Sequence, residues 1–218
     1  MNYRNRISET FGPDALGDAL FYRVPGGLRF ELSEGGAALD QVLTAVRKAT
    51  TILEHFFPPE GTIVVCLRRF MGTSPFSLRR PLRELALAGV TIPKERETWL
   101  EPVALDDRWD ETIEEWTAFA LFEFPISRLQ TLLWCAVATD FGPFRPNPHC
   151  SIYFLDFEKR LLAHPYDDRG MDVIGPNINL LAEAYVRFNS MLLDYDRPTM
   201  DHAFKSALCA PAAGYPAG

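Results

Sequence analysis

The stretch SIYFLDFEKRLLAHPY, residues 151–166, decides the class of fold. It contains two mainly apolar runs of strand length, 151–157 and 160–166, and only Glu158 and Lys159 separate them. Strands joined by so short a link are antiparallel, because a parallel pair needs a crossover of about a dozen residues or more. The sequence therefore predicts a β-hairpin, and with it a sheet that contains antiparallel pairs.

Two strand–helix–strand segments come before this hairpin. The first runs from a strand at Leu28–Leu32 to a β-branched strand at Thr62–Leu67. Between these strands, apolar residues recur at the spacing of a helix face, and the pattern ends before Pro58. We expect this helix to bury one stripe of side chains, made up of Leu39, Val42, Leu43, Val46 and Leu53.

The second segment begins at Trp116–Phe124, which is apolar at nearly every position. Such a run is typical of a strand that is covered on both faces. Pro125 ends the strand, and a helix is predicted over about residues 127–139. The first strand of the hairpin closes the segment.

Weaker patterns fill the remaining chain. Residues 19–24 are interpreted as a strand, 81–88 as a short helix, and the rest of 71–115 as surface loop. The last strong pattern predicts a long helix from about Asn177 to Tyr195. Residues 206–218 have nothing to anchor them and are expected to form a disordered tail.

Together these elements predict a single domain over residues 1–205, of α+β or α/β class. Its sheet is mixed and mostly antiparallel, packed by about three main helices. With 218 residues, of which 47% are hydrophobic, the chain can bury a core without a disulfide or a structural metal. The cysteines form no CxxC pair, so we expect reduced core residues at Cys66, Cys135, Cys150 and Cys209.

Composition also argues against several classes of function. The polar start lacks the apolar segment of an export signal, and no apolar stretch reaches the roughly 18 to 20 residues of a membrane span. Reduced cysteines then favour the cytoplasm. A net charge of −7 and a pI near 5.2 disfavour nucleic-acid binding. The nearest approach to a basic face is interpreted as a solvated strand end and helix entry: Arg68, Arg69, Arg79, Arg80 and Arg83.

The densest polar group follows the hairpin. It consists of Tyr166, Asp167, Asp168, Arg169 and Gly170, with Asp172 shortly after. Its carboxylates could hold a hard cation, and its arginine could pair with an anionic ligand. In the alternative, which we favour, the group is a turn: an aspartate bonds its own backbone, and the glycine takes a positive φ.

A similar group closes the predicted long helix: Asp194, Tyr195, Asp196 and Arg197. Carboxylates at a helix C-terminus meet the negative end of the helix dipole, which is unfavourable unless a partner compensates. If the two groups meet in space, they form a buried ion network or a small binding pocket. The alternative, which we favour, is an isolated irregularity at the end of the helix.

A third group is an acidic surface between residues 106 and 115. Asp107, Glu111 and Glu114 would share one face of a helical turn. Such a face is usually only solvated, but it could also dock a basic partner, because acidic fields steer association. The candidate partner surface is Asp107, Asp110, Glu111 and Glu114.

Searches for catalytic signatures find no candidate. The sequence has no GxSxG elbow, no Walker loop, no GxGxxG after a strand and no HExxH. The histidines are scattered, without a neighbour at metal-ligand spacing: His55, His149, His164 and His202. We therefore predict no catalytic residue, no metal site and no cofactor.

Several segments together resemble one bacterial family, catalogued as domain of unknown function 3885. They are GLRFEL (27–32), RKATTILEHFF (47–57), HPYDDRGMDVI (164–174) and RFNSMLLDYDR (187–197). The resemblance covers most of the chain in order, and YDDRG with the later LDYDR is its most specific part. It implies a bacterial protein, and it favours a joint role for these two motifs, in architecture or in a site.

Three hypotheses of function follow. The first is a non-enzymatic, protein-binding domain of the bacterial cytoplasm, for example an immunity-type protein that masks a basic toxin. The second is an enzyme, or a small-ligand or metal-binding protein, that uses the Asp/Arg cluster at 167–172. The third is a structural domain whose YDDRG turn only locks a hairpin against the last helix. Geometry discriminates between a site and a scaffold, since carboxylates that converge on a cleft beside Arg169 favour a site, and carboxylates bonded to their own turn favour a scaffold.

Overall fold

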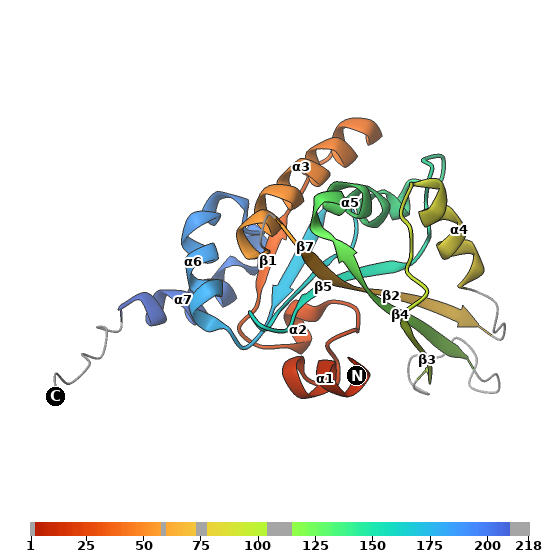
Figure 1. The fold of residues 1–218 in the computed structure, drawn as a ribbon. Helices are drawn as coiled ribbons and strands as arrows, with labels where there is room; N and C mark the ends of the chain where they lie inside the picture. Colours follow the sequence, from red (N-terminus) through yellow and green to blue (C-terminus); the bar gives the residue numbers. More distant parts are fainter. Residues whose placement is uncertain (1–2, 58–59, 73–77, 104–114, 210–218) are drawn as a thin grey trace.

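A computed structural model describes residues 3–57, 60–72, 78–103 and 115–209 (Figure 1). One twisted sheet runs through the domain in the order β1-β7-β6-β5-β2-β4-β3. Every neighbouring pair in it is antiparallel, which confirms the α+β class and the antiparallel pairing. The sheet is not mixed as expected, since no parallel pair occurs among the described strands. The strands are β1 (Leu28–Glu31), β2 (Thr62–Gly72), β3 (Glu97–Pro102), β4 (Trp116–Pro125), β5 (Ser151–Asp156), β6 (Leu161–Pro165) and β7 (Gly170–Ile174).

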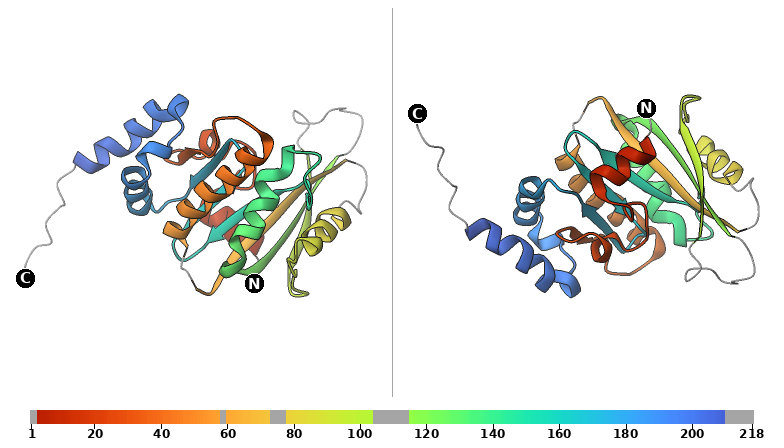
Figure 2. Two further views of the ribbon diagram at one scale, coloured as in Figure 1. Left: turned by 90° about the horizontal axis from the view of Figure 1, so that it is seen from above. Right: turned by 90° about the horizontal axis from the view of Figure 1, so that it is seen from below.

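Helices cover both faces of the sheet (Figures 1 and 2). On one face lie α3 (Ala38–Phe56), α4 (Arg79–Leu87) and α5 (Leu129–Val137). The opposite face is covered by α1 (Tyr3–Phe11) and the single turn α2 (Leu20–Arg23). The last helices, α6 (Ile178–Arg187) and α7 (Arg197–Cys209), pack at the β1 end. Short 3₁₀ turns are η2 (Ile126–Arg128), η3 (Ala138–Asp140), η4 (Asn189–Met191) and η5 (Asp194–Asp196).

The two predicted strand–helix–strand segments are present as β1-α3-β2 and β4-α5-β5. In each segment the two strands point the same way but are not neighbours. Three strands separate β1 from β2, and β2 lies between β4 and β5. The hairpin β5-β6 forms where the short link predicts it, with Phe154 opposite Ala163.

Side chains that alternate across the strands build two separate cores. The larger core lies under α3 and α5, where Phe30, Val65 and Phe154 are buried. The smaller one lies under α1 and α2, where Tyr153 and Leu162 are buried. As predicted, β4 is buried at nearly every position, because helices cover it on one side and the smaller core on the other.

Two predicted elements are wrong. Residues 19–24 form the helical turn α2 instead of a strand, because the backbone N–H of Phe21 donates to Asp172 Oδ2 at 3.1 Å. The long helix from Asn177 ends at Arg187 instead of Tyr195. The chain beyond it extends along β1, where Leu192 forms an antiparallel bridge with Phe30.

Three elements were not predicted: α1, β3 and β7. The central residue of β7 is Asp172, and a charged residue in a five-residue run hides the strand pattern. In the predicted stripe of α3, Val42 and Leu53 are buried, but Leu39 and Leu43 are each 52% exposed. Leu43 points about 100° away from Val42 around the helix, and Leu39 belongs to the first turn.

Three cysteines, Cys66, Cys135 and Cys150, are free and buried, as predicted. Within the part of the chain that the structure describes, no helix is both long and apolar enough to cross a membrane. Helix α7 runs to Cys209 and so includes residues 206–209, which were expected to belong to the disordered tail. Residues 210–218 lie outside the described residues, as do 104–114.

Candidate functional site

The YDDRG motif is the connection between β6 and β7. The Oδ1 atom of Asp167 accepts from the backbone N–H groups of Arg169, at 2.8 Å, and Gly170, at 3.2 Å. Its Oδ2 atom accepts from the Arg169 guanidinium, with Nε at 2.8 Å. Asp167 is therefore bonded to its own turn, as turn chemistry predicts. The Arg169 side chain is otherwise exposed, with Asp140 at 3.9 Å.

Asp168, the next residue of the turn, is also buried. Its Oδ2 atom accepts from the Ser33 hydroxyl at 3.0 Å. Next to this bond, the Leu32 N–H donates to the Arg169 carbonyl at 2.8 Å. Burial raises the pKa of the Asp168 carboxyl, and the bond from Ser33 opposes that shift. Asp168 thus ties the turn to the residues that follow β1.

Gly170 has a different role from the predicted one. Its φ is not positive, so no left-handed conformation requires a glycine here. Instead, the Tyr166 ring lies over it, and a Cβ at position 170 would overlap the tyrosine hydroxyl and lie 3.1 Å from the Phe30 carbonyl. The glycine is needed because the ring and β1 approach its backbone closely.

Asp172 lies on β7 directly opposite Arg29 on β1. The Arg29 Nε donates to Asp172 Oδ1 at 2.8 Å, and the Asp172 side chain is fully buried. Its second oxygen accepts from the Phe21 N–H. Burial raises the pKa of the Asp172 carboxyl, and the charge of Arg29 works against that shift. The pair joins two neighbouring strands and the turn α2.

Asp196 is the second carboxylate on the same arginine. Arg29 Nη1 donates to Asp196 Oδ2 at 3.2 Å, and the Tyr22 hydroxyl donates to Oδ1 at 2.9 Å. The Leu193 N–H also donates to the Arg29 carbonyl at 2.9 Å. The structure therefore brings the two Asp/Arg groups of the sequence together through Arg29. We call Arg29, Asp172 and Asp196 the Arg29 cluster.

The other members of the LDYDR group remain at the surface. The side chain of Asp194 is 93% exposed and accepts from Arg197 Nε at 3.0 Å. Tyr195 is also exposed. Because α6 ends early, Asp194 and Asp196 precede the N-terminus of α7 and do not close a long helix. Negative charge is favourable there, so the expected conflict with the helix dipole does not arise.

Aromatic rings enclose the Arg29 cluster. The Arg29 guanidinium lies 4.6 Å from the ring centre of Tyr22, 5.2 Å from that of Tyr166 and 5.6 Å from that of Phe21. Burial acts to lower the pKa of Arg29, but the two carboxylates raise it overall and hold the group charged. Both carboxylates are already hydrogen-bonded inside the protein, which favours a structural role.

Sequence reasoning missed Arg29 and Tyr22. Arg29 stands between Leu28 and Phe30 in a short strand, where alternation makes an arginine look solvent-facing. In the described residues, no group of three or more histidines, cysteines or carboxylates is placed to hold a metal ion. The candidate partner surface of Asp107, Asp110, Glu111 and Glu114 lies outside the described residues.

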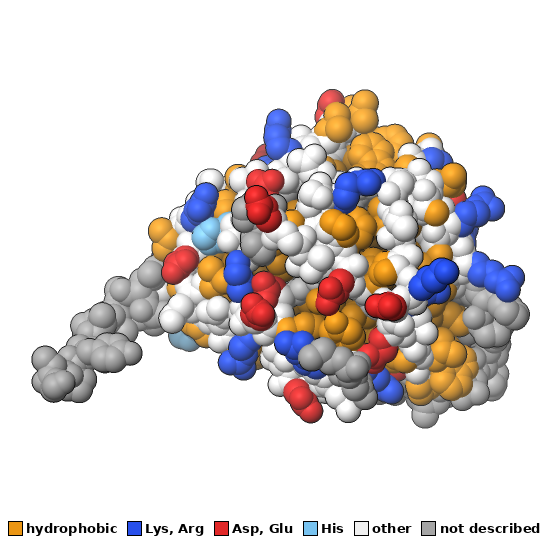
Figure 3. Space-filling view, viewed as in Figure 1, with side chains coloured by type: hydrophobic (Ala, Val, Ile, Leu, Met, Phe, Trp, Pro, Cys, Tyr) orange, Lys and Arg blue, Asp and Glu red, His pale blue; other side chains and the backbone are white. Residues whose placement is uncertain are grey.

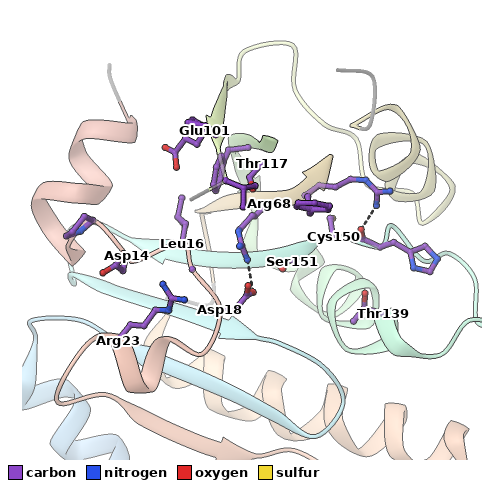
Figure 4. A pocket seen from close by; sticks show the side chains of 18 residues that line it. Asp14, Leu16, Asp18, Arg23, Arg68, Glu101, Thr117, Thr139, Cys150 and Ser151 are labelled. Carbon is purple, nitrogen blue, oxygen red and sulfur yellow. Dashed lines mark hydrogen bonds and ion pairs between the residues drawn. The ribbon is translucent and has the colours of Figure 1, made fainter. Parts of the chain in front are cut away.

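A polar groove opens elsewhere, beside the first residue of β5 (Figure 4). Its volume is about 700 Å³. Arg23 of α2, with Arg68 and Arg69 of β2, line it together with Asp18 and Ser151. No residue of the YDDRG or LDYDR groups lines this groove.

The fold and the cluster define a single-domain α+β protein, with one antiparallel sheet whose edge strand is tied to the rest by buried ion pairs. Within that class, the chain belongs to the family described as domain of unknown function DUF3885, whose model matches residues 3–196. This confirms the resemblance. No curated protein and no solved structure matches the chain.

Proposed function

We propose that this chain is a non-catalytic domain of the bacterial cytoplasm that binds a basic protein partner, in the manner of an immunity protein that masks a basic toxin. The observation that carries the proposal is the concentration of charge between residues 106 and 115. Six acidic residues and one arginine there account for five of the seven net negative charges of the chain. We call this stretch the acidic segment.

The acidic segment connects β3 to β4 at the edge of the sheet. At its two ends, the Val103 N–H donates to the Glu115 carbonyl at 2.9 Å, which prolongs the β3-β4 pairing. Leu100, on β3 just before this point, is 46% exposed. An exposed apolar side chain close in the sequence to concentrated charge suits a protein interface, because charge steers the encounter and apolar burial stabilises the complex.

Acidic and basic side chains interleave over the described residues of the face shown in Figure 3. Neighbouring charges of opposite sign partly cancel, and salt screens exposed charges beyond about 8 Å at physiological ionic strength. A basic partner would therefore be attracted less by this face than by the acidic segment.

The geometry gives less support to an enzyme built on residues 167–172. Asp167 is bonded to its own turn, and Asp172 is bonded to Arg29 and the Phe21 backbone. Asp168 is buried against Ser33. A general acid or base needs a proton-transfer path to a substrate, whereas these carboxylates are engaged within the fold.

The test is to capture partners with the tagged protein, to purify the complex, and to measure its stoichiometry and affinity by calorimetry. The test variant reverses Asp110, Glu111 and Glu114 to lysine. The matched control reverses three exposed acidic residues elsewhere, namely Glu9, Glu54 and Glu158. We expect a complex of near-equal stoichiometry, weakened about tenfold or more by the test variant.

The control variant should retain binding within about threefold, apart from the common effect of net charge. Equal losses in both variants would show that the acidic segment has no specific role. Failure to isolate any partner, together with turnover of a small molecule by the purified chain, would contradict the proposal as a whole.

A further inference from the structure

The polar groove arises from a mismatch in strand length. The first residue of β5, Ser151, pairs with Arg68, whereas β2 continues to Gly72. Beyond Arg68, the side of β2 that faces β5 therefore has no paired strand among the described residues. The chain around residues 13–18 forms one wall of the resulting groove, and Thr139 lies on the opposite wall (Figure 4).

Two of the three arginines in the groove have unused donors. Arg23 is exposed and has neither a hydrogen bond nor an ion pair with any described residue, and its side chain lies against Gly17. Arg69 donates through Nη1 to the His149 carbonyl, but its Nε is buried and has no partner among the described residues. Unused arginine donors beside a cavity are suited to oxygen atoms of an anion.

The third arginine is engaged by a solvent-exposed carboxylate. Arg68 Nη1 donates to Asp18 Oδ1 at 2.6 Å, and 68% of the Asp18 side chain is exposed. The backbone of the loop that carries Asp18 is held in place by Tyr153, whose hydroxyl lies within hydrogen-bonding distance of the carbonyls of Leu16 and Gly17, each at 3.0 Å. Asp18 therefore stands where an anionic group of a ligand would meet Arg68.

The two other acidic residues of the groove, Glu101 and Asp14, differ in their partners. Glu101 accepts from Arg4 at 3.0 Å and from the Trp99 indole, so its charge is already engaged. Asp14 has no ion pair among the described residues, and it lies with Arg23 on the wall formed by residues 13–18 (Figure 4). Hydroxyls that could bond the remaining oxygens of an anion come from Thr117, Thr139 and Ser151.

We propose that the polar groove binds a small molecule through a phosphate or carboxylate group, which Arg23 and Arg68 hold after displacing Asp18. A guanidinium offers paired donors in a fixed plane, and both phosphate and carboxylate present matching oxygens. The groove volume of about 700 Å³ admits a molecule of metabolite size. This site is independent of the acidic segment and of the proposed protein binding.

If a ligand anion replaces Asp18 at Arg68, two variants should have opposite effects on the affinity for the anion. Arg23→Gln removes one anion contact, so binding should weaken about fivefold or more. Asp18→Asn removes the competing carboxylate, so binding should tighten by about the same factor. Arg47→Gln and Glu54→Gln, on the exposed side of α3, make the same changes of net charge away from the groove and should change binding less than about twofold.

The measurement is calorimetric titration of the full chain with inorganic phosphate and, separately, with citrate, at constant ionic strength. Binding of either anion with the two opposite shifts supports the site, and the tighter of the two identifies the preferred group. The proposal is overturned if neither anion binds at millimolar concentration. It is equally overturned if each groove variant behaves like its matched control.

Discussion

Arg29 and Asp172 face each other across the antiparallel strands β1 and β7, joined by a 2.8 Å hydrogen bond between Nε and Oδ1. They are 143 residues apart in the sequence, and both are buried. Asp196 adds a second carboxylate to the same arginine. Because β1 is an edge strand with four residues, this cluster fixes an element that has few backbone bonds of its own.

Asp196 and Asp194 form a matched pair for testing that role. Asp196 is 5% exposed and bonded to Arg29 and Tyr22, whereas Asp194 is exposed and bonded to Arg197. Asp196→Asn should lower the free energy of unfolding by about 1–3 kcal/mol. Asp194→Asn should change it by less than about 0.5 kcal/mol. Urea denaturation of both variants checks this, and similar effects in the two would argue against a special role for Asp196.

Gly170 should tolerate no side chain while Tyr166 is present. Gly170→Ala places a methyl group under the tyrosine ring and is expected to cost about 1–3 kcal/mol of stability. In a Tyr166→Ala background the same change should cost clearly less. Gly142→Ala is the control, because its added Cβ would meet nothing within 4 Å. If Gly170→Ala lowers the stability equally with and without Tyr166, then the backbone, and not the tyrosine ring, excludes a side chain at position 170.

The raised pKa of Asp168 predicts that the stability of the protein depends on pH. Its pKa is raised by burial, so the folded state holds a proton on this carboxyl more tightly than the unfolded chain does. Its contribution to stability is therefore greatest below about pH 3.8 and falls as the pH rises through the folded-state pKa. Asp168→Asn is neutral at every pH, so its destabilisation relative to the wild type should shrink between about pH 4 and pH 7.

Urea denaturation of the wild type and Asp168→Asn at several pH values provides the measurement. Asp194→Asn serves as an exposed control. The account is contradicted if the difference in free energy of unfolding between wild type and Asp168→Asn stays constant or grows towards neutral pH. Either result would mean that burial does not dominate the titration of the Asp168 carboxyl.

Much of the fold could be predicted because its signals are local. The link at Glu158 and Lys159 is short enough to require an antiparallel hairpin, and the apolar run at Trp116–Phe124 identifies a covered strand. The turn α2 could not be predicted in this way. The bond from Phe21 to Asp172 connects residues 151 positions apart, and no local pattern reports it.

The cluster was only partly predictable for a related reason. The aspartates at 172 and 196 are conspicuous, because charged residues stand beside apolar runs. Arg29 occupies a strand in which exposed and buried positions normally alternate, so an arginine there resembles a solvent-facing residue. The position is an interior one because rings from elsewhere cover it, including Tyr22 of α2 and Tyr166 of the β6-β7 turn.

A double-mutant cycle between Arg29 and Asp172 tests most directly whether the Asp/Arg groups are an internal structural cluster. The variants are Arg29→Met, Asp172→Leu and the double variant, each measured by urea denaturation. We expect Arg29→Met to cost about 3 kcal/mol or more, because it leaves the buried Asp172 and Asp196 without their cation. Asp172→Leu should cost less, about 2 kcal/mol, because Arg29 keeps Asp196 as a partner. The double variant should recover a coupling energy of about 2 kcal/mol or more. Single effects that add within about 0.5 kcal/mol would contradict the account.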